Sequence, residues 1–182
     1  MSEAAGVRRG MRLAVMRCVR SLAVLVLLAH TAAADPPPLY EAELRLGYGV
    51  AVDGGAGMMA TRPSPLTIAA TGSVAVSADP QVAAYAGLVA ETLDRSSVGA
   101  TAGARLTSPK LPIRLAAGGT WLFAPYTLWG LQGSAGACAR SGTGLGLCAD
   151  LQLTAYVAGT DLAPGRTVTQ IQGVIGMVFD AL

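Results

Sequence analysis

From about Leu44 to its end, the chain consists of short segments in which every second residue is apolar. The first segment places Leu44, Leu46, Tyr48 and Val50 on one side, and the residues between them are mostly small, polar or charged. Similar alternation recurs in the runs 66–76, 98–106 and 145–157. Successive side chains of a β-strand point to opposite faces of a sheet, so this period of two predicts strands with one apolar and one polar face.

Turn-forming residues divide the chain after Pro36-Pro37-Pro38 into eight predicted strands. Asp79-Pro80, Pro109 and Pro125 are among the separators, because proline cannot donate to a strand ladder. The predicted strands cover 39–52, 66–77, 81–93, 97–107, 110–122, 126–137, 145–157 and 168–179. Strands of a soluble sandwich are usually about 5–6 residues long, whereas about 9–11 residues cross a membrane at a tilt. We therefore expect an all-β fold, an eight-stranded antiparallel up-and-down transmembrane β-barrel.

One segment is compatible with two structures. Asp79-Pro80-Gln81 is a good helix start, and Val82, Tyr85, Ala86 and Val89 recur with helical spacing. We predict a strand over 81–93, with a helix as the alternative, because short apolar runs do not separate the two by periodicity alone. A helix here would prevent closure at eight strands.

The N-terminal segment has the pattern of a secretory signal peptide. Five arginines between Arg8 and Arg20 precede the apolar run 21–29, which is followed by small residues up to Ala34. The run is about half the roughly 20 apolar residues that a spanning helix needs. We expect a signal peptide at 1–34, with Met11 or Met16 as alternative starts, and a single β-barrel domain at 35–182.

Removal of residues 1–34 changes the charge of the protein. Five of the 13 basic residues and one of the 11 acidic residues leave, so eight Lys or Arg remain against ten Asp or Glu. The mature chain is slightly acidic and has no cluster of basic residues. Without such an electrostatic footprint we expect no nucleic-acid partner.

The polar faces of the predicted strands carry charges of both signs. Narrow barrels fill their interior with side chains, so opposite charges facing inward can pair across the lumen. A solvated sheet face is the alternative. The predicted polar network of the lumen comprises Glu41, Glu43, Arg45, Arg105, Arg114, Asp150 and Gln152.

Two cysteines, Cys138 and Cys148, flank a predicted turn of the mature chain. An even, closely spaced pair in an exported protein indicates a disulfide. Alternation places both side chains on the inward face, opposite each other across one hairpin. A metal-binding pair is the alternative, but two cysteines without histidine supply only half of a zinc site.

Catalytic chemistry has little support in the sequence. The single histidine, His30, lies within the expected signal peptide, so no Ser-His or Cys-His pair remains. Glu41 and Glu43 share a face and could serve as acid and base, but ion pairing with Arg45 is the simpler interpretation. We expect no enzyme activity, no metal and no cofactor.

Over residues 39–182 this arrangement of strands resembles the small eight-stranded outer-membrane barrels of Gram-negative bacteria, with OmpA-like or OmpX-like architecture. Members of that class usually end in an aromatic residue, whereas Asp180-Ala181-Leu182 follow Phe179 here. Aromatic rings near strand ends would mark the membrane boundaries. These residues are Tyr40, Tyr48, Trp121, Phe123, Tyr126, Trp129 and Phe179.

The resemblance implies a non-enzymatic protein of structural or surface-interaction type, located in the outer membrane of a Gram-negative bacterium. Its partners would be outer-membrane lipid and, through the loops 53–65 and 159–166, an external ligand or protein. The alternative is a soluble exported β-barrel or sandwich, periplasmic or secreted, that binds a small apolar ligand inside. That alternative requires the Ala, Val and Leu face to point inward.

The disulfide is testable on the mature exported protein. We expect alkylation to modify neither Cys138 nor Cys148 until the protein has been reduced, after which mass spectrometry should detect two modified thiols. Two free thiols in the unreduced protein would contradict the pairing.

Overall fold

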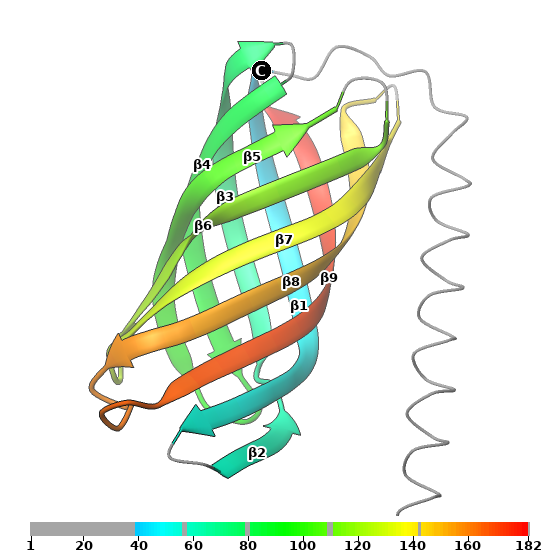
Figure 1. Cartoon of the computed structure of the whole chain (residues 1–182). Coiled ribbons are helices and arrows are strands. Elements are labelled where there is room, and N and C mark those ends of the chain that lie inside the picture. The colour runs from blue at the N-terminus through cyan, green and yellow to red at the C-terminus, as the bar shows by residue number, and fades with distance from the viewer. Residues whose placement is uncertain (1–38, 56–57, 79–80, 109–110, 142, 182) are drawn as a thin grey trace, which may run out of the picture.

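A computed structural model describes residues 39–55, 58–78, 81–108, 111–141 and 143–181 (Figure 1). The expected signal peptide, 1–34, lies outside these residues. Within the described part of the chain, no helix is long and apolar enough to cross a membrane.

The described residues form nine β-strands in one antiparallel sheet. Its order is β2-β1-β3-β4-β5-β6-β7-β8-β9, and β1 also pairs with β9, so eight strands close into a barrel (Figure 1). The predicted closed eight-stranded antiparallel barrel is confirmed. The strands are β1 (Tyr40–Gly55), β2 (Met58–Pro63), β3 (Leu66–Ala78), β4 (Gln81–Thr92), β5 (Ser97–Thr107), β6 (Ile113–Ala124), β7 (Leu128–Arg140), β8 (Leu145–Gly159) and β9 (Thr167–Ala181).

The segment 81–93 is a strand, as predicted, and the alternative helix is wrong. β4 pairs along its length with β3 and β5. Its lumen side carries Tyr85, Val89 and Glu91, which are all buried, while Leu88 points outward. The helical spacing of its apolar residues arises because apolar residues lie on both faces of this strand, Tyr85 and Val89 in the lumen and Ala86 and Leu88 outside.

The segment 53–65 was expected to be a loop, and this expectation is wrong. β1 continues to Gly55, and β2 pairs with its extension from Val50↔Pro63 to Gly55↔Met58. Between β2 and β3 the chain turns toward the lumen at Ser64, which is buried with 1% of its surface exposed. The result is a β-hairpin beyond the rim of the barrel, which sequence analysis missed because it contains Gly and Pro and lacks alternation.

The strands β6 and β7 begin and end two to three residues later than predicted. Pro112 lacks an N–H group and cannot donate to a ladder, so β6 begins after it. Its carbonyl still accepts a hydrogen bond from Cys138 N at 3.1 Å. At the other end, a turn with a cis Ala124–Pro125 peptide bond separates the two strands.

The two ends of the barrel differ in what they contain. We call the end with the start of β1 and the finish of β9 the terminal end, and the opposite end, which carries β2 and the β6–β7 and β8–β9 turns, the distal end (Figure 1). An apolar cluster fills the lumen near the distal end. Its members are Ala51, Ala69, Val89, Leu122, Leu128, Tyr156 and Val168.

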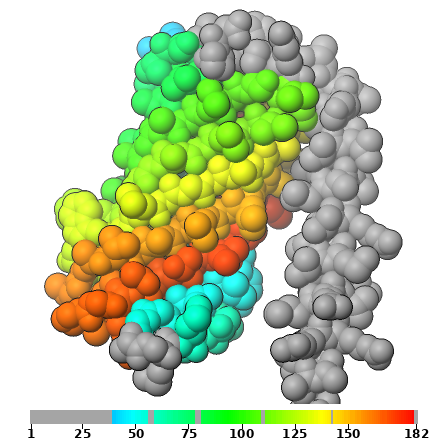
Figure 2. All heavy atoms as spheres, viewed as in Figure 1, coloured from blue at the N-terminus to red at the C-terminus, as the bar shows by residue number. Residues whose placement is uncertain are grey.

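Each of the eight barrel strands exposes large apolar side chains on the outer wall, one face of which is seen in Figure 2. Leu131 and Ile175 are each 68% exposed and Leu151 is 59% exposed, although all three lie within strands. Charged side chains such as Glu43 and Arg105 are buried inside. The register is therefore opposite to the one that the soluble ligand-binding alternative requires, with the Ala, Val and Leu face outside.

Candidate functional site

The terminal half of the lumen holds six of the seven residues predicted to form a polar network. Three arginines and three carboxylates, all no more than 9% exposed, meet there from β1, β5, β6 and β8. We call these six residues the lumen network: Glu41, Glu43, Arg45, Arg105, Arg114 and Asp150.

Each arginine of the lumen network contacts a carboxylate on another strand. Arg105 donates to Glu41 Oε2 at 3.1 Å and also to Glu43. Arg114 donates from Nε to Asp150 Oδ1 at 2.9 Å and from Nη2 to Glu43 Oε1 at 2.6 Å. Arg45 Nη2 donates to Asp150 Oδ2 at 3.0 Å.

The charges of the lumen network balance, three positive against three negative. Balance is required because an isolated charge buried away from water costs several kcal/mol, and removal of one partner from a buried pair costs about 3–5 kcal/mol. The carboxylates of Glu41 and Glu43 are engaged with arginines, so this geometry favours ion pairing over acid–base chemistry. The lumen network therefore links β1, β5, β6 and β8 across the lumen.

Glycines make room for the acidic members of the lumen network. A Cβ atom on Gly176 of β9 would lie 2.6 Å from Glu43 Oε1, and one on Gly136 of β7 would lie 2.1 Å from Asp150 Oδ1. The Gly136 Cβ would also lie 2.2 Å from the carbonyl oxygen of Ala149. A side chain at Gly136 or Gly176 would therefore overlap the carboxylate that lies against that glycine.

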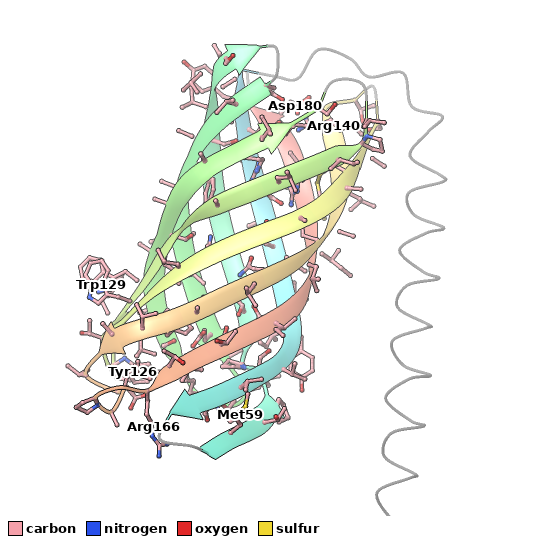
Figure 3. The ribbon with its side chains drawn as sticks, in the orientation of Figure 1. Met59, Tyr126, Trp129, Arg140, Arg166 and Asp180 are labelled. Carbon is pink, nitrogen blue, oxygen red and sulfur yellow. A yellow bond between two sulfur atoms is a disulfide. The ribbon has the colours of Figure 1, made fainter. Side chains whose placement is uncertain are left out.

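Arg140 and Asp180 form a second ionic layer at the terminal rim, which the sequence analysis did not include (Figure 3). Arg140 Nη1 donates to Asp180 Oδ1 at 2.5 Å, and Arg140 Nη2 pairs with Glu41. Arg140 follows Cys138 by two residues in β7, so the two side chains point to the same, lumen-facing side of the strand. Extending the predicted strand to Arg140 would have revealed this side chain.

The two cysteines lie where alternation predicts them. Cys138 of β7 and Cys148 of β8 are directly opposite each other, with Cα atoms 4.1 Å apart, and the structure joins them in a disulfide. Cys148 is 2% exposed. The bond therefore lies on the lumen side of the wall, close to Asp150.

The seventh predicted residue, Gln152, lies deeper in the lumen than the lumen network. Its side chain donates to Thr154 Oγ1 at 3.2 Å, so it is not part of the ionic contacts. Together with Arg45 and Gln132, it lines a small cavity with about 20 Å³ of space open to water. That volume accommodates about one water molecule. Arg45 Nε has no hydrogen-bond partner and lies 3.7 Å from Glu43 Oε1.

A second polar cluster in the distal half is centred on Glu91, which sequence analysis missed. Tyr156 OH and Gln170 Nε2 donate to Glu91 Oε1 at 3.1 and 3.0 Å, and Arg95 Nε and Ser97 Oγ donate to Oε2 at 2.7 and 3.2 Å. Glu91 lies on the same face of the predicted strand 81–93 as Tyr85 and Val89, so its alternation in that strand could have identified it.

Arg95 lies in the turn between β4 and β5 and closes the distal end of the lumen. Its guanidinium lies 5.4 Å from the ring centre of Tyr126 and 5.5 Å from that of Tyr156. Burial disfavours the charge of Arg95, but Glu91, Tyr126 and Tyr156 together outweigh burial and raise the pKa of Arg95 above its ordinary value. Burial also raises the pKa of Tyr126.

The distal rim presents the β1–β2 hairpin and short turns. Arg62 of β2 pairs with Asp53 at 3.2 Å and with Asp94 of the β4–β5 turn, which ties the hairpin to its neighbour. Met59 is 81% exposed at the hairpin, and Arg166 points away from the rim (Figure 3). The predicted contact segment 159–166 contains the last residue of β8 and the turn to β9.

Aromatic side chains gather on the outer wall near both ends. Trp121 and Trp129 stack with ring centres 4.8 Å apart, and Phe123 contacts Trp121 edge-on at 5.4 Å, all near the distal end. Tyr40 and Phe179 are exposed near the terminal end. Two aromatic groups therefore flank the apolar wall.

In the part of the chain that the structure describes, no group of three or more His, Cys, Asp or Glu side chains is arranged to hold a metal ion.

No protein-family model matches the chain, and no curated protein matches its sequence. Among solved structures, the chain is similar to Neisserial surface protein A, NspA, with a TM-score of 0.48 and 10% sequence identity. The match covers 78% of this chain and 97% of that one.

The space reserved for Asp150 makes a matched pair of glycine substitutions informative. We expect Gly136→Ala to lower the free energy of unfolding by about 2 kcal/mol, because its Cβ overlaps Asp150 and the backbone of β8. Gly133 of the same strand points outward, and its Cβ would lie 3.8 Å from the nearest atom, so Gly133→Ala should change stability by less than about 1 kcal/mol. Denaturant unfolding from detergent micelles measures both, and equal effects would contradict the inward placement of Asp150.

Proposed function

We propose that this chain is a non-enzymatic outer-membrane β-barrel of structural or surface-interaction type from a Gram-negative bacterium. Residues 1–34 would direct export and be removed, and the domain 35–182 would be inserted in the membrane. Outer-membrane lipid would surround the wall, and the distal rim would be the contact surface for an external ligand or protein.

The observation that carries this proposal is the inverted distribution of side chains in a closed barrel. Large apolar side chains such as Leu131, Leu151 and Ile175 are mostly exposed, while the lumen network is buried. A soluble monomer rarely exposes contiguous apolar patches larger than a few hundred Å². Closure through β1 and β9 also leaves no open sheet edge along the barrel wall, as hydrocarbon requires.

Dimensions and aromatic residues support the same location. The eight barrel strands are 11 to 16 residues long, enough to cross hydrocarbon at a tilt. Trp121, Phe123 and Trp129 near one end, with Tyr40 and Phe179 near the other, match the aromatic girdles of membrane barrels. Such barrels have short periplasmic turns and longer external connections, so the distal end, with its hairpin, would face outward.

The filled lumen argues for anchoring and surface contact over transport. The lumen network occupies the terminal half, and the apolar cluster with Glu91 occupies the distal half. Eight strands enclose an interior that side chains can fill. Functional contacts would therefore involve the distal rim, where Met59 and Arg166 are exposed.

Cell fractionation tests the location directly. We expect the mature chain in the outer-membrane fraction, and we expect it to migrate faster on SDS gels before boiling than after, because a closed barrel resists SDS kinetically. Recovery in the soluble periplasmic fraction without a heat-dependent shift would contradict the proposal.

Substitution of arginine on the wall separates a lipid-facing from a water-facing surface. Leu151 is mid-strand in β8 and 59% exposed, so Leu151→Arg should cost about 2–4 kcal/mol of unfolding free energy in lipid vesicles. Leu93, in the β4–β5 turn and 76% exposed, is the control, and Leu93→Arg should cost less than about 1 kcal/mol. If both substitutions were tolerated equally, the wall would face water.

A further inference from the structure

The Cys138–Cys148 disulfide lies between two ionic layers of the lumen. On the rim side, Arg140 reaches from β7 to Asp180 of β9 and Glu41 of β1. It crosses β8 at Gly146, where an added Cβ would lie 3.1 Å from Arg140 Cγ. Gly146 is the next lumen-facing residue of β8 after Cys148 toward the rim.

The interior side of the disulfide is closed by the lumen network. Asp150 is the next lumen-facing residue of β8 beyond Cys148, and Arg45 and Arg114 both bind it. On the outside, β7 and β8 are part of a continuous hydrogen-bonded wall. Cys148 is only 2% exposed and Cys138 is partly buried, so the closed barrel leaves little of the bond exposed, with Arg140 on its open, rim side.

Forming the disulfide requires only a local part of the fold. The two cysteines are ten residues apart in sequence and oppose each other across the β7–β8 hairpin. The contacts that enclose them are long-range, because Arg140 and Glu41 are 99 residues apart and Arg45 and Asp150 are 105 residues apart. The pair can therefore meet before its enclosure exists.

We infer that Cys138 and Cys148 are oxidised before the barrel closes, by exchange with the disulfide of an exported thiol oxidant. The inference rests on the export that is part of the proposed function. Exchange requires a thiolate to approach a sulfur atom directly, so access limits its rate. A protein-sized oxidant reaches the open hairpin but not a bond inside the closed lumen.

The exchange proceeds in two steps. One cysteine loses a proton, and its thiolate attacks the oxidant's disulfide to give a mixed disulfide while one oxidant sulfur leaves as a thiolate. The second cysteine, also deprotonated, attacks its partner's sulfur and releases the other oxidant sulfur. The chain gives up two electrons and two protons, and the oxidant becomes a dithiol.

Oxidation rates of the folded and unfolded chain test the inference. The reduced mature chain is treated with oxidised glutathione, either unfolded in urea or folded in detergent, and remaining thiols are trapped with a maleimide that shifts gel mobility. Rates are corrected for urea with free cysteine as the standard. We expect the folded barrel to oxidise at least tenfold more slowly, and a smaller ratio overturns the inference.

If the reduced chain fails to fold, the reverse reaction gives the same comparison. The oxidised barrel in detergent and the oxidised chain in urea are reduced with dithiothreitol, and the same tenfold ratio applies. Both measurements are made in detergent or urea, so they do not depend on where the protein resides in the cell. Failure of the proposed location would instead appear in the fractionation experiment.

A pair of arginine variants tests the rim cover. Arg140→Ala should raise the exchange rate of the folded barrel at least fivefold and leave the rate in urea unchanged. Arg166→Ala, at the opposite rim, is the control and should leave both rates unchanged. Heat-dependent gel mobility verifies that each variant is folded. Equal rates for the two folded variants overturn the role of Arg140 as a cover.

Discussion

Pairing of β1 with β9 is the constraint on which the rest of the structure depends. Fifteen residue pairs, from Tyr40↔Ala181 to Gly54↔Thr167, join the first barrel strand to the last. Without this seam, the sheet would have two unpaired edges and no interior. Closure assigns every strand residue to the wall or the lumen, and polar residues that would be hydrated on an open sheet must then find partners across a narrow space.

The lumen meets that requirement differently at its two ends. Near the terminal end, arginines and carboxylates from facing strands neutralise each other, and glycines such as Gly136 and Gly176 leave space for them. Near the distal end, apolar side chains pack around a single carboxylate, Glu91, whose oxygens accept four hydrogen bonds. Both solutions fill the interior, so the barrel is held from inside as well as along its strands.

Alternation along the sequence predicted the eight barrel strands to within a few residues. The two faces of each strand differ in polarity, and this difference can be seen from that strand's own residues. Alternation also predicted that Cys138 and Cys148 oppose each other, since both lie in one hairpin. β2 was missed because Met58–Pro63 pairs only with an extension of β1 and shows no alternation.

The sequence did not predict which residues pair with each other inside the lumen. Alternation predicted that Arg105, Arg114 and Asp150 point inward, but which of them meet depends on strand tilt and stagger around the closed barrel. Those quantities belong to the whole sheet and not to any segment. Glu91 was left out of the predicted network although its position in the predicted strand 81–93 places it on the inward face.

The cross-lumen contacts also govern how the chain folds. Arg105 and Glu43 are 62 residues apart in sequence, and Arg114 and Glu43 are 71 residues apart, so these ion pairs cannot form within any short piece of the chain. Folds dominated by such distant contacts assemble slowly. A partly assembled sheet would present unpaired arginines and carboxylates and would gain no interior until its ends meet. The barrel should therefore fold as one cooperative unit, with no stable intermediate that lacks the first strand.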